Sequence, residues 1–255
     1  RSIHANQSPD VGRAGSFWPR VTDLVLLFLV VLAGAAIRGA FSLVYLCRRK
    51  ETQKIFAVKV INKALCVKKK SLRDEITVLL RVKHANIISL EEVYESDQEL
   101  LLVMERVTGG ELFDRIVRVG VYSERQAAEI ITNVLQALRY LHSCNILHRD
   151  IKPENILLAS GDSGEVKLSD FGICKILEDE DDGARSRGRA YTSCGTDYYV
   201  AAKDLIRNLL NVSAQDRFSA AQALNHPWIK GEYNEQPLAS AVMEMKRFNQ
   251  KRRFN

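Results

Sequence analysis

Apolar residues recur with two different periods along the chain, and these periods predict its main elements. Ile55 to Ile61 and Glu99 to Val107 are rich in β-branched and aliphatic residues, which is typical of strands. Lys70 to Val82 is predicted to be a helix, since Leu72, Ile76, Leu79 and Leu80 recur at helical spacing. Ser123 and Gln126 form a capping-box pattern that predicts a helix as far as Leu141, with an apolar stripe along it (Ala127, Ile130, Ile131, Val134, Leu138 and Leu141).

An uncharged run from Leu24 to Ile37 stands out near the start of the chain, with Arg13 and Arg20 before it. It is short for a membrane span, which needs about 18 residues. Its length and the small residues up to Ala35 fit the core of a signal peptide. Cleavage after Ala35 would, however, remove a strand. We therefore expect a buried first strand with an unusual extension, or a wrongly joined exon, and a membrane or secretory role is the alternative.

Composition limits the class of protein. A chain of 255 residues with 46% hydrophobic and 27% charged residues is expected to be globular, as one domain of two lobes. The excess of 37 basic over 31 acidic residues fits an anionic partner, and phosphate groups account for it without nucleic acid. The five cysteines lack zinc-binding spacing and are odd in number, so we expect reduced thiols and a cytoplasmic protein. The chain does not begin with Met, which suggests a fragment or a processed form.

The strongest chemical signal is the run H-R-D-I-K-P-E-N from His148 to Asn155, followed by D-F-G at Asp170. Phosphoryl transfer needs positioned groups that neutralise charge. Asp150 would accept the proton of an attacking hydroxyl, and Lys152 would place a cation on the transferred phosphate. Asn155 and Asp170 offer oxygen ligands that suit Mg²⁺. The alternative, a solvated polar turn between two strands, would not explain the D-F-G that follows.

These motifs resemble those of eukaryotic protein kinases, and Lys152 is typical of the serine/threonine branch. The segments G-G-E-L-F-D-R-I from Gly109 and H-P-W-I from His226 are most similar to calcium- and calmodulin-regulated kinases. The resemblance implies an α+β, bilobal fold with a β-rich N-lobe and a mostly helical C-lobe. It divides the chain into an arm with the apolar run (1–36), the N-lobe (37–107), the C-lobe (108–230) and a basic tail (231–255).

The resemblance also implies ATP as cofactor together with Mg²⁺. Lys59 would hold the α- and β-phosphates and Glu75 would hold Lys59, because a lysine on a strand that faces the core is costly unless it is paired. The other implied nucleotide contacts are Met104 at the back of the pocket, Glu105 to Val107 along the adenine edge, and Val44, Ala57 and Leu157 above and below the ring. Each of these apolar residues could equally be plain core.

Two further parts of the nucleotide site are implied, and the first of them departs from the family pattern. Ile37 to Val44 lies where kinases carry G-x-G-x-x-G-x-V, and only the middle glycine, Gly39, is kept. A β-branched residue such as Ile37 takes positive φ poorly, so the loop over the phosphates is expected to be stiffer or displaced. Glu111 would meet the ribose and, with Glu154, an arginine upstream of the target serine or threonine.

The resemblance breaks after Ala201. There the family continues with Pro-Glu and several helices of the C-lobe, whereas Ala202 and Lys203 here already match a much later helix. Arg217 would lose its glutamate partner and would have to rearrange or reach water. A deletion or gene-model error and a real compact variant both remain possible.

Two segments suggest regulation. Thr192 lies where the family carries an activating phosphothreonine, which could pair with Arg149. The tail from Leu238 to Asn255 is basic and amphipathic, as in a calmodulin target or an autoinhibitory segment, although a solvated basic end is an equal alternative.

The sequence therefore predicts a serine/threonine protein kinase that acts on proteins with basic residues upstream of the target. The alternative is a catalytically impaired kinase-like module that binds nucleotide or a regulator. A secreted protein is disfavoured, because its cysteines would have to pair.

Overall fold

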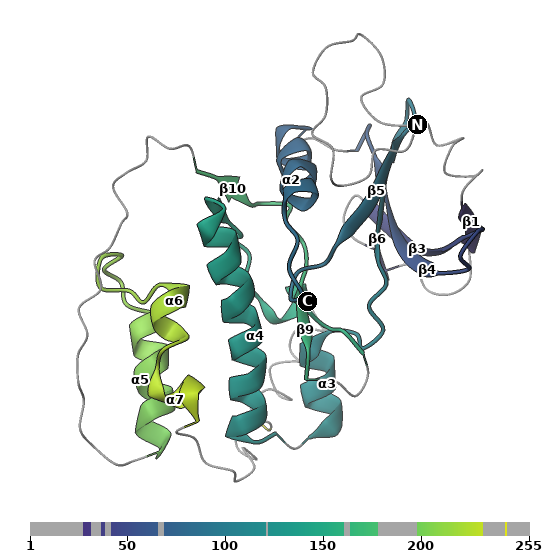
Figure 1. The fold of residues 1–255 in the computed structure, drawn as a ribbon. Coiled ribbons are helices and arrows are strands. Elements are labelled where there is room, and N and C mark those ends of the chain that lie inside the picture. The colour runs from purple at the N-terminus through teal and green to yellow at the C-terminus, as the bar shows by residue number, and fades with distance from the viewer. Residues whose placement is uncertain are drawn as a thin grey trace. The chain divides into compact units, whose positions relative to one another are not determined.

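The computed structural model forms two compact units, described separately here (Figure 1). Unit 1 comprises Arg1–Val107 and Phe171–Cys174, and unit 2 comprises Thr108–Asp170 and Lys175–Asn255. The structure describes residues 28–31, 37–38, 42–65, 69–120, 122–160, 164–177, 198–231 and 243, with the backbone alone at 28–31, 37–38, 69–71 and 198–201. Gly39, Thr192 and nearly all of the basic tail lie outside these ranges.

Unit 1 is built on an antiparallel sheet with the order β1-β3-β4-β6-β5, and β2 also pairs with β3. Its strands are β1 (Phe28–Val31), β2 (Ile37–Arg38), β3 (Ser42–Arg49), β4 (Ile55–Asn62), β5 (Leu90–Glu95) and β6 (Glu99–Glu105), and its helix is α2 (Lys69–Arg81). The strands and the helix predicted from periodicity are therefore confirmed, apart from shifts of one or two residues at their ends.

One face of this sheet is a closed core. Its cluster consists of Cys47, Phe56, Val58, Tyr94, Leu101 and Val103, each at most 5% exposed. Side chains of a strand alternate between the two faces, so the neighbours of these residues in sequence lie on the other face. The residues of β3 on that second face are partly buried, as are Ile55, Ala57 and Lys59 of β4, whereas Ile61 of β4 is buried.

Part of the apolar run near the start of the chain is a strand. β1 pairs with β3, with Phe28 opposite Arg49 and Val31 opposite Leu46, and it is the end strand of the sheet. The expectation of a first strand is thus confirmed at the backbone of these four residues. Within the described ranges, no helix has the length and apolar character needed to cross a membrane.

Unit 2 is mostly helical. Its helices are α3 (Leu112–Val119), α4 (Glu124–Ser143), the 3-10 helix η1 (Pro153–Asn155), α5 (Tyr198–Leu209), α6 (Ala220–Ala223) and α7 (Pro227–Lys230). Two short antiparallel pairs complete it, β8 (Ile156–Leu158) with β9 (Val166–Leu168) and β7 (Ile146–Leu147) with β10 (Lys175–Ile176). The predicted α+β fold class, with a β-rich N-terminal unit and a mostly helical C-terminal unit, is therefore confirmed.

The long helix α4 organises the core of unit 2. The expected capping box is present, since Ser123 Oγ accepts from the backbone N–H of Gln126 and Gln126 Oε1 accepts from that of Ser123. Helices α5 to α7 pack on α4 through a cluster of buried residues (Ala128, Leu135, Leu205, Ala220, Ala223 and Trp228). Trp228 Nε1 also donates to Glu124 Oε2 at 3.3 Å, which ties α7 to the start of α4.

Helix α5 runs without interruption through the position where the resemblance breaks. It begins at Tyr198 and ends at Leu209, so residues on both sides of the Ala201–Ala202 junction belong to one helix. Arg217 is exposed, and its guanidinium donates from Nε to the Asn211 carbonyl at 2.7 Å and from Nη2 to the Val212 carbonyl at 3.2 Å. Of the two outcomes expected for Arg217, rearrangement or access to water, the structure shows access to water.

Candidate functional site

In unit 1, the expected ion pair between Lys59 and Glu75 is present. Lys59 Nζ donates to Glu75 Oε1 at 2.8 Å, and the two side chains are 21% and 8% exposed. Lys59 lies near the middle of β4, and Glu75 lies on the inner side of α2. Because a carboxylate this deeply buried needs a partner, the pair holds the lysine in one place on the sheet.

The apolar residues expected around an adenine ring share a face of the sheet with Lys59. Val44 is directly opposite Lys59 in the β3–β4 pair. Ala57 is two residues from Lys59 and directly opposite Met104 in the β4–β6 pair. All three apolar residues are only partly buried, in contrast to the closed core on the other face. Unit 1 thus presents an accessible apolar surface beside a fixed ammonium group.

The structure says less about the nucleotide contacts expected at Ile37, Gly39 and Glu105. The Glu105 carboxylate accepts from the Ser89 backbone N–H at 2.7 Å, so this side chain is engaged inside unit 1. Only backbone groups of Glu105 to Val107 are then suited to an adenine edge. The backbone of Ile37 lies in β2 opposite Val44, and Gly39 is outside the described residues.

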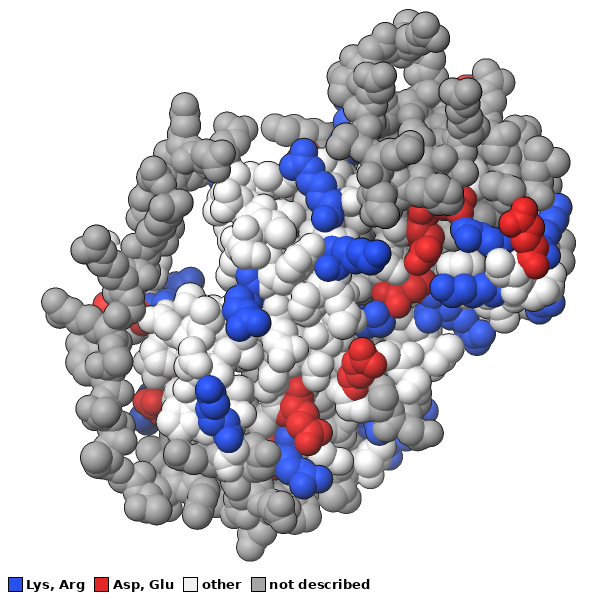
Figure 2. All heavy atoms as spheres, in the orientation of Figure 1, with Lys and Arg blue, Asp and Glu red and all other residues white. Residues whose placement is uncertain are grey.

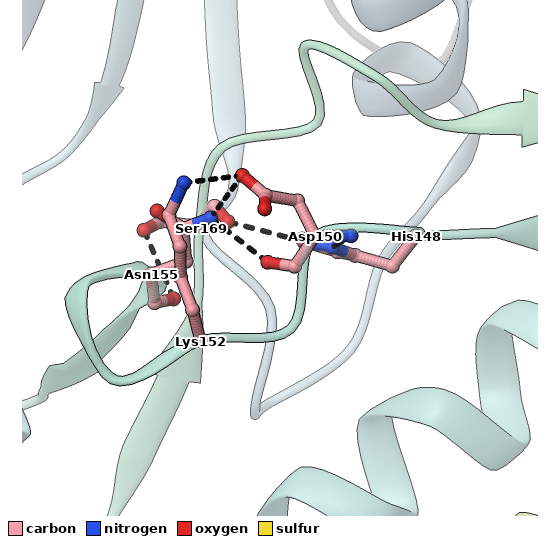
Figure 3. Close-up of polar contacts among 5 residues, drawn as sticks. All are labelled: His148, Asp150, Lys152, Asn155 and Ser169. Atoms are coloured by element: carbon pink, nitrogen blue, oxygen red, sulfur yellow. Dashed lines mark hydrogen bonds and ion pairs between the residues drawn. The ribbon is translucent and has the colours of Figure 1, made fainter.

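In unit 2, Asp150 is surrounded by positioned donors (Figure 3). Lys152 Nζ lies 2.6 Å from Asp150 Oδ2, and Asn155 Nδ2 donates to the same oxygen at 2.9 Å. Asn155 Nδ2 also donates to the Asp150 backbone carbonyl at 2.9 Å. These bonds fix the carboxylate in a loop that otherwise has no regular structure.

The same bonds fix the orientation of the Asn155 amide. Both acceptors near Nδ2 are oxygen atoms, so exchanging the amide nitrogen and oxygen would place oxygen against oxygen. Asn155 is 5% exposed, and its backbone carbonyl accepts from Ser169 N at 2.9 Å and Ser169 Oγ at 3.1 Å. These contacts bring Asp170, the residue after Ser169, to the loop that carries Asp150 and Asn155.

The oxygen atoms of Asn155 and Asp170 fit a magnesium ion chemically. Hard cations prefer carboxylate and amide oxygens, and Mg²⁺ commonly takes only one or two protein ligands together with substrate phosphates. Among the described residues, no group of three or more His, Cys, Asp or Glu side chains could hold a metal by itself. A magnesium ion held by Asn155 and Asp170 would take its remaining ligands from water and substrate phosphates.

His148 has a positioning role that the sequence analysis did not assign. Its side chain is 1% exposed, Nε2 lies 3.1 Å from the Ser169 carbonyl, and Nδ1 accepts from the Asp150 backbone N–H at 3.3 Å. One nitrogen must donate and the other must accept, which requires the neutral ring. Burial lowers the pKa of His148, which favours the same form. The signal in the sequence was its place in H-R-D.

Charges in the loop stabilise one another. The hydrogen bond from Lys152 is the main cause that lowers the pKa of Asp150, and the bond from Asn155 adds to it. The bond to Asp150 raises the pKa of Lys152 in turn. At neutral pH both groups are therefore charged, and Asp150 is a carboxylate able to accept a proton.

The backbone around both aspartates is unusual. Arg149 has φ 69° and Asp170 has φ 60°, so they are two of the four described residues other than glycine in the left-handed region, the others being Gln53 and Asn145. Such conformations cost free energy and are concentrated at functional sites. The two left-handed residues are consistent with a functional role for the Asp150 loop and the Asp170 segment.

The segment after unit 1 pairs with β8. Gly109 N donates to the Leu158 carbonyl at 3.1 Å, and Leu158 N donates to the Gly110 carbonyl at 2.9 Å. Glu111 and Leu157 form a β-bridge next to this pair. The structure thus brings Glu111 and Leu157, two of the expected nucleotide contacts, side by side within unit 2.

Comparison with known proteins identifies the family. A family model for the protein kinase domain matches residues 37–203. The chain belongs to the protein kinase family. It is 38% identical to human calcium/calmodulin-dependent protein kinase type IV over 275 aligned residues, which cover 85% of this chain and 58% of the relative. It is 35% identical to myosin light chain kinase A of Dictyostelium discoideum, covering 81% of this chain and 90% of the relative.

These alignments also bear on the break after Ala201. The chain spans 58% of the length of the human relative, and the alignment of 275 positions is longer than the whole chain of 255 residues. The alignment therefore contains positions at which the relative has residues and this chain has none. The family match ends at Lys203, close to the junction inside α5.

Proposed function

We propose that this chain transfers the γ-phosphoryl group of Mg-ATP to serine or threonine hydroxyls of proteins. The observation that carries the proposal is the Asp150 carboxylate, held by Lys152 and Asn155 at hydrogen-bond distance. The membership of the protein kinase family supports it.

Each unit would contribute separate groups to the nucleotide. Lys59, fixed by Glu75, would bind the α- and β-phosphates, and the partly buried face with Val44, Ala57 and Met104 would contact the adenine. In unit 2, Leu157 would contact the adenine ring as well. Asn155 and Asp170 would hold magnesium, which neutralises phosphate charge and so favours attack on the γ-phosphorus.

The chemical step would use Asp150 and Lys152. Asp150 would accept a hydrogen bond from the substrate hydroxyl, whose oxygen then attacks the γ-phosphorus while the bond to the β-phosphate oxygen breaks. The hydroxyl proton would pass towards Asp150 as negative charge builds on the transferred group. Lys152 lies beside Asp150 and would stabilise that charge.

Substrates with an upstream arginine are the proposed class. Glu111 precedes α3 and Glu154 lies in η1, and α3 and η1 are in contact in unit 2. Two carboxylates on neighbouring elements suit the bidentate binding of a guanidinium. On the face shown in Figure 2, acidic side chains lie among the basic ones, which is unlike a surface for nucleic acid.

Calmodulin is a proposed regulator of the basic tail. The human relative is named as calmodulin-dependent, and the tail has the basic amphipathic pattern of such targets. We also propose a cytoplasmic location, since Cys47 and Cys144 form no disulfide bond within the described residues.

The test is the transfer of labelled γ-phosphate from Mg-ATP to an Arg-x-x-Ser peptide by protein that is folded by circular dichroism. Asp150→Asn keeps the hydrogen-bonding shape and removes the base, and we expect it to lower kcat by about 10²-fold or more. The KM for an Ala-x-x-Ser peptide should be higher than the KM for the Arg-x-x-Ser peptide. Folded wild-type protein without transfer, or transfer unchanged in Asp150→Asn, would contradict the proposal.

A second candidate function is a nucleotide-binding module that does not phosphorylate proteins. It is favoured by the positions absent from this chain in the alignment with the human relative. This module would bind Mg-ATP, as measured by calorimetry, and would show no transfer to any peptide. Binding with transfer would exclude it.

A further inference from the structure

Helix α5 has a second apolar face that packs on nothing in the described structure. Its inner side carries Ala202, Leu205 and Leu209, which join the core on α4. Its outer side carries Ile206, which is 54% exposed, and Leu210 one turn later, which is 74% exposed. A helix that is apolar on two sides is expected to be covered on both.

The turn after α5 carries a further exposed apolar residue. Val212 is 93% exposed, and its backbone carbonyl is held by Arg217 Nη2. Phe218 N donates to the Asn208 carbonyl at 3.0 Å, which folds the chain back along the end of the helix. Val212 is therefore exposed on an ordered turn, and not on a loose end.

Basic residues accompany the apolar ones. Lys203 and Arg207 are exposed, and the spacing 203, 206, 207 and 210 places these residues on one side of the helix. We call Lys203, Ile206, Arg207, Leu210 and Val212 the outer α5 surface. It combines exposed apolar side chains with two exposed positive charges.

We propose that the outer α5 surface docks an acidic amphipathic helix of a partner protein. The exposed apolar side chains would pack against the apolar stripe of that helix, and its Asp or Glu residues would flank Lys203 and Arg207. Contiguous exposed apolar residues rimmed by charge are typical of protein-binding surfaces.

Charge argues against two other occupants. A second copy that docked through the same surface would bring Lys203 and Arg207 near their own like charges. The tail of this chain carries Lys246, Arg247, Lys251, Arg252 and Arg253, and is basic as well. An acidic partner is the occupant that the charges favour.

The test uses the full chain and a fluorescein-labelled helical peptide of three heptads, with Leu at positions a and d and Glu at e and g. A matched peptide with Lys in place of Glu is the control. We expect fluorescence anisotropy to report binding of the acidic peptide alone, at least tenfold weaker in 500 mM than in 50 mM salt. No binding of the acidic peptide up to 1 mM, or equal binding of both peptides, would overturn the proposal.

Variants locate the surface. Lys203→Glu combined with Arg207→Glu should weaken binding of the acidic peptide at least tenfold and allow the Lys peptide to bind. Ile206→Ser with Leu210→Ser should remove binding of the acidic peptide. Val119→Ser, at a residue of α3 that is 52% exposed, should leave that binding unchanged. Circular dichroism and thermal unfolding verify that each variant folds. Binding that is unaffected by the α5 variants would contradict the proposal.

Sedimentation velocity examines the alternative of self-association. We expect a monomer at 50 µM, with and without Ile206→Ser and Leu210→Ser. A dimer that these substitutions dissociate would identify a second copy as the occupant and overturn the proposal. None of these measurements depends on phosphoryl transfer, so the outcome is independent of the proposed function.

Discussion

Asp150 illustrates how single residues in this chain are held. Its carboxylate accepts from Lys152 and Asn155, and its backbone N–H donates to the buried ring of His148. The residue types and the chemistry proposed for them could be predicted from the H-R-D-x-x-x-x-N spacing. The double donation by Asn155 and the tautomer of His148 could not, because they depend on the path of the loop and on burial.

Replacing Lys152 tests the electrostatics of this loop. The hydrogen bond from Lys152 lowers the pKa of Asp150, so the stabilisation of the carboxylate is present above the ordinary pKa of an aspartate and is lost as pH falls. Lys152→Ala should therefore move the acid limb of kcat/KM to higher pH and lower kcat about 10²-fold. Lys230→Ala, an exposed lysine of α7, is the control and should do neither. An unchanged acid limb would show that Asp150 does not set it.

Substitutions in the Lys59–Glu75 pair distinguish an effect on ATP binding from an effect on folding stability. Lys59→Met leaves the buried Glu75 carboxylate without this partner, which should cost about 2 kcal/mol in the free energy of unfolding. Lys59→Met combined with Glu75→Leu should recover most of that loss, since no buried charge remains. Both variants should lose ATP affinity, measured by calorimetry, together with urea unfolding for stability. Full ATP affinity in the stable double variant would show that Lys59 does not bind phosphate.

At the scale of elements, two adjacent glycines serve different purposes. A Cβ on Gly109 would lie 2.4 Å from Leu158 Cβ and 2.6 Å from the Leu158 carbonyl oxygen, whereas a Cβ on Gly110 would meet no atom within 4 Å. Gly110 instead has φ +74°, which is unfavourable for any other residue. Gly109 thus permits the close approach to β8, and Gly110 permits the turn.

The two glycines should respond differently to alanine. Gly110→Ala should cost about 1 kcal/mol from backbone strain alone. Gly109→Ala should cost about 3 kcal/mol, because β8 must move to relieve the contact. Chemical denaturation of both variants measures the difference. Equal losses would mean that β8 accommodates the methyl group without strain.

The elements differ in how far the sequence determined them. Helix α4 was predicted with its cap, because the capping box and the apolar stripe are local features. The continuous helix α5 was not, since the resemblance divides it at Ala201, and helix formation there depends on packing of Leu205 and Leu209 on α4. The strand β1 was expected within a longer apolar run, but its pairing with β3 is a non-local contact that the run alone cannot specify.

At the scale of the whole molecule, the expected nucleotide ligands come from both units. Lys59 belongs to unit 1, and Asn155 and Asp170 belong to unit 2. The sequence motifs assign these residues to the same function, but they do not specify any contact between them. If the proposed function is correct, a nucleotide must engage both sets, and its binding must depend on each.

Mg-ATP should therefore raise the stability of the wild-type chain, and a substitution in the binding residues of either unit should abolish this increase. At a concentration 100 times Kd, binding adds about 2.7 kcal/mol to the stability of the native state, which corresponds to roughly 5–10 °C in Tm for a chain of this size. Lys59→Met and Asp170→Asn should each remove most of this shift, and EDTA should reduce it in the wild type, because the phosphates then lose the metal that joins them to Asn155 and Asp170. Differential scanning fluorimetry measures all four conditions. A full shift in Asp170→Asn, or one indifferent to EDTA, would mean that unit 1 binds the nucleotide without a metal, and such binding would not support phosphoryl transfer.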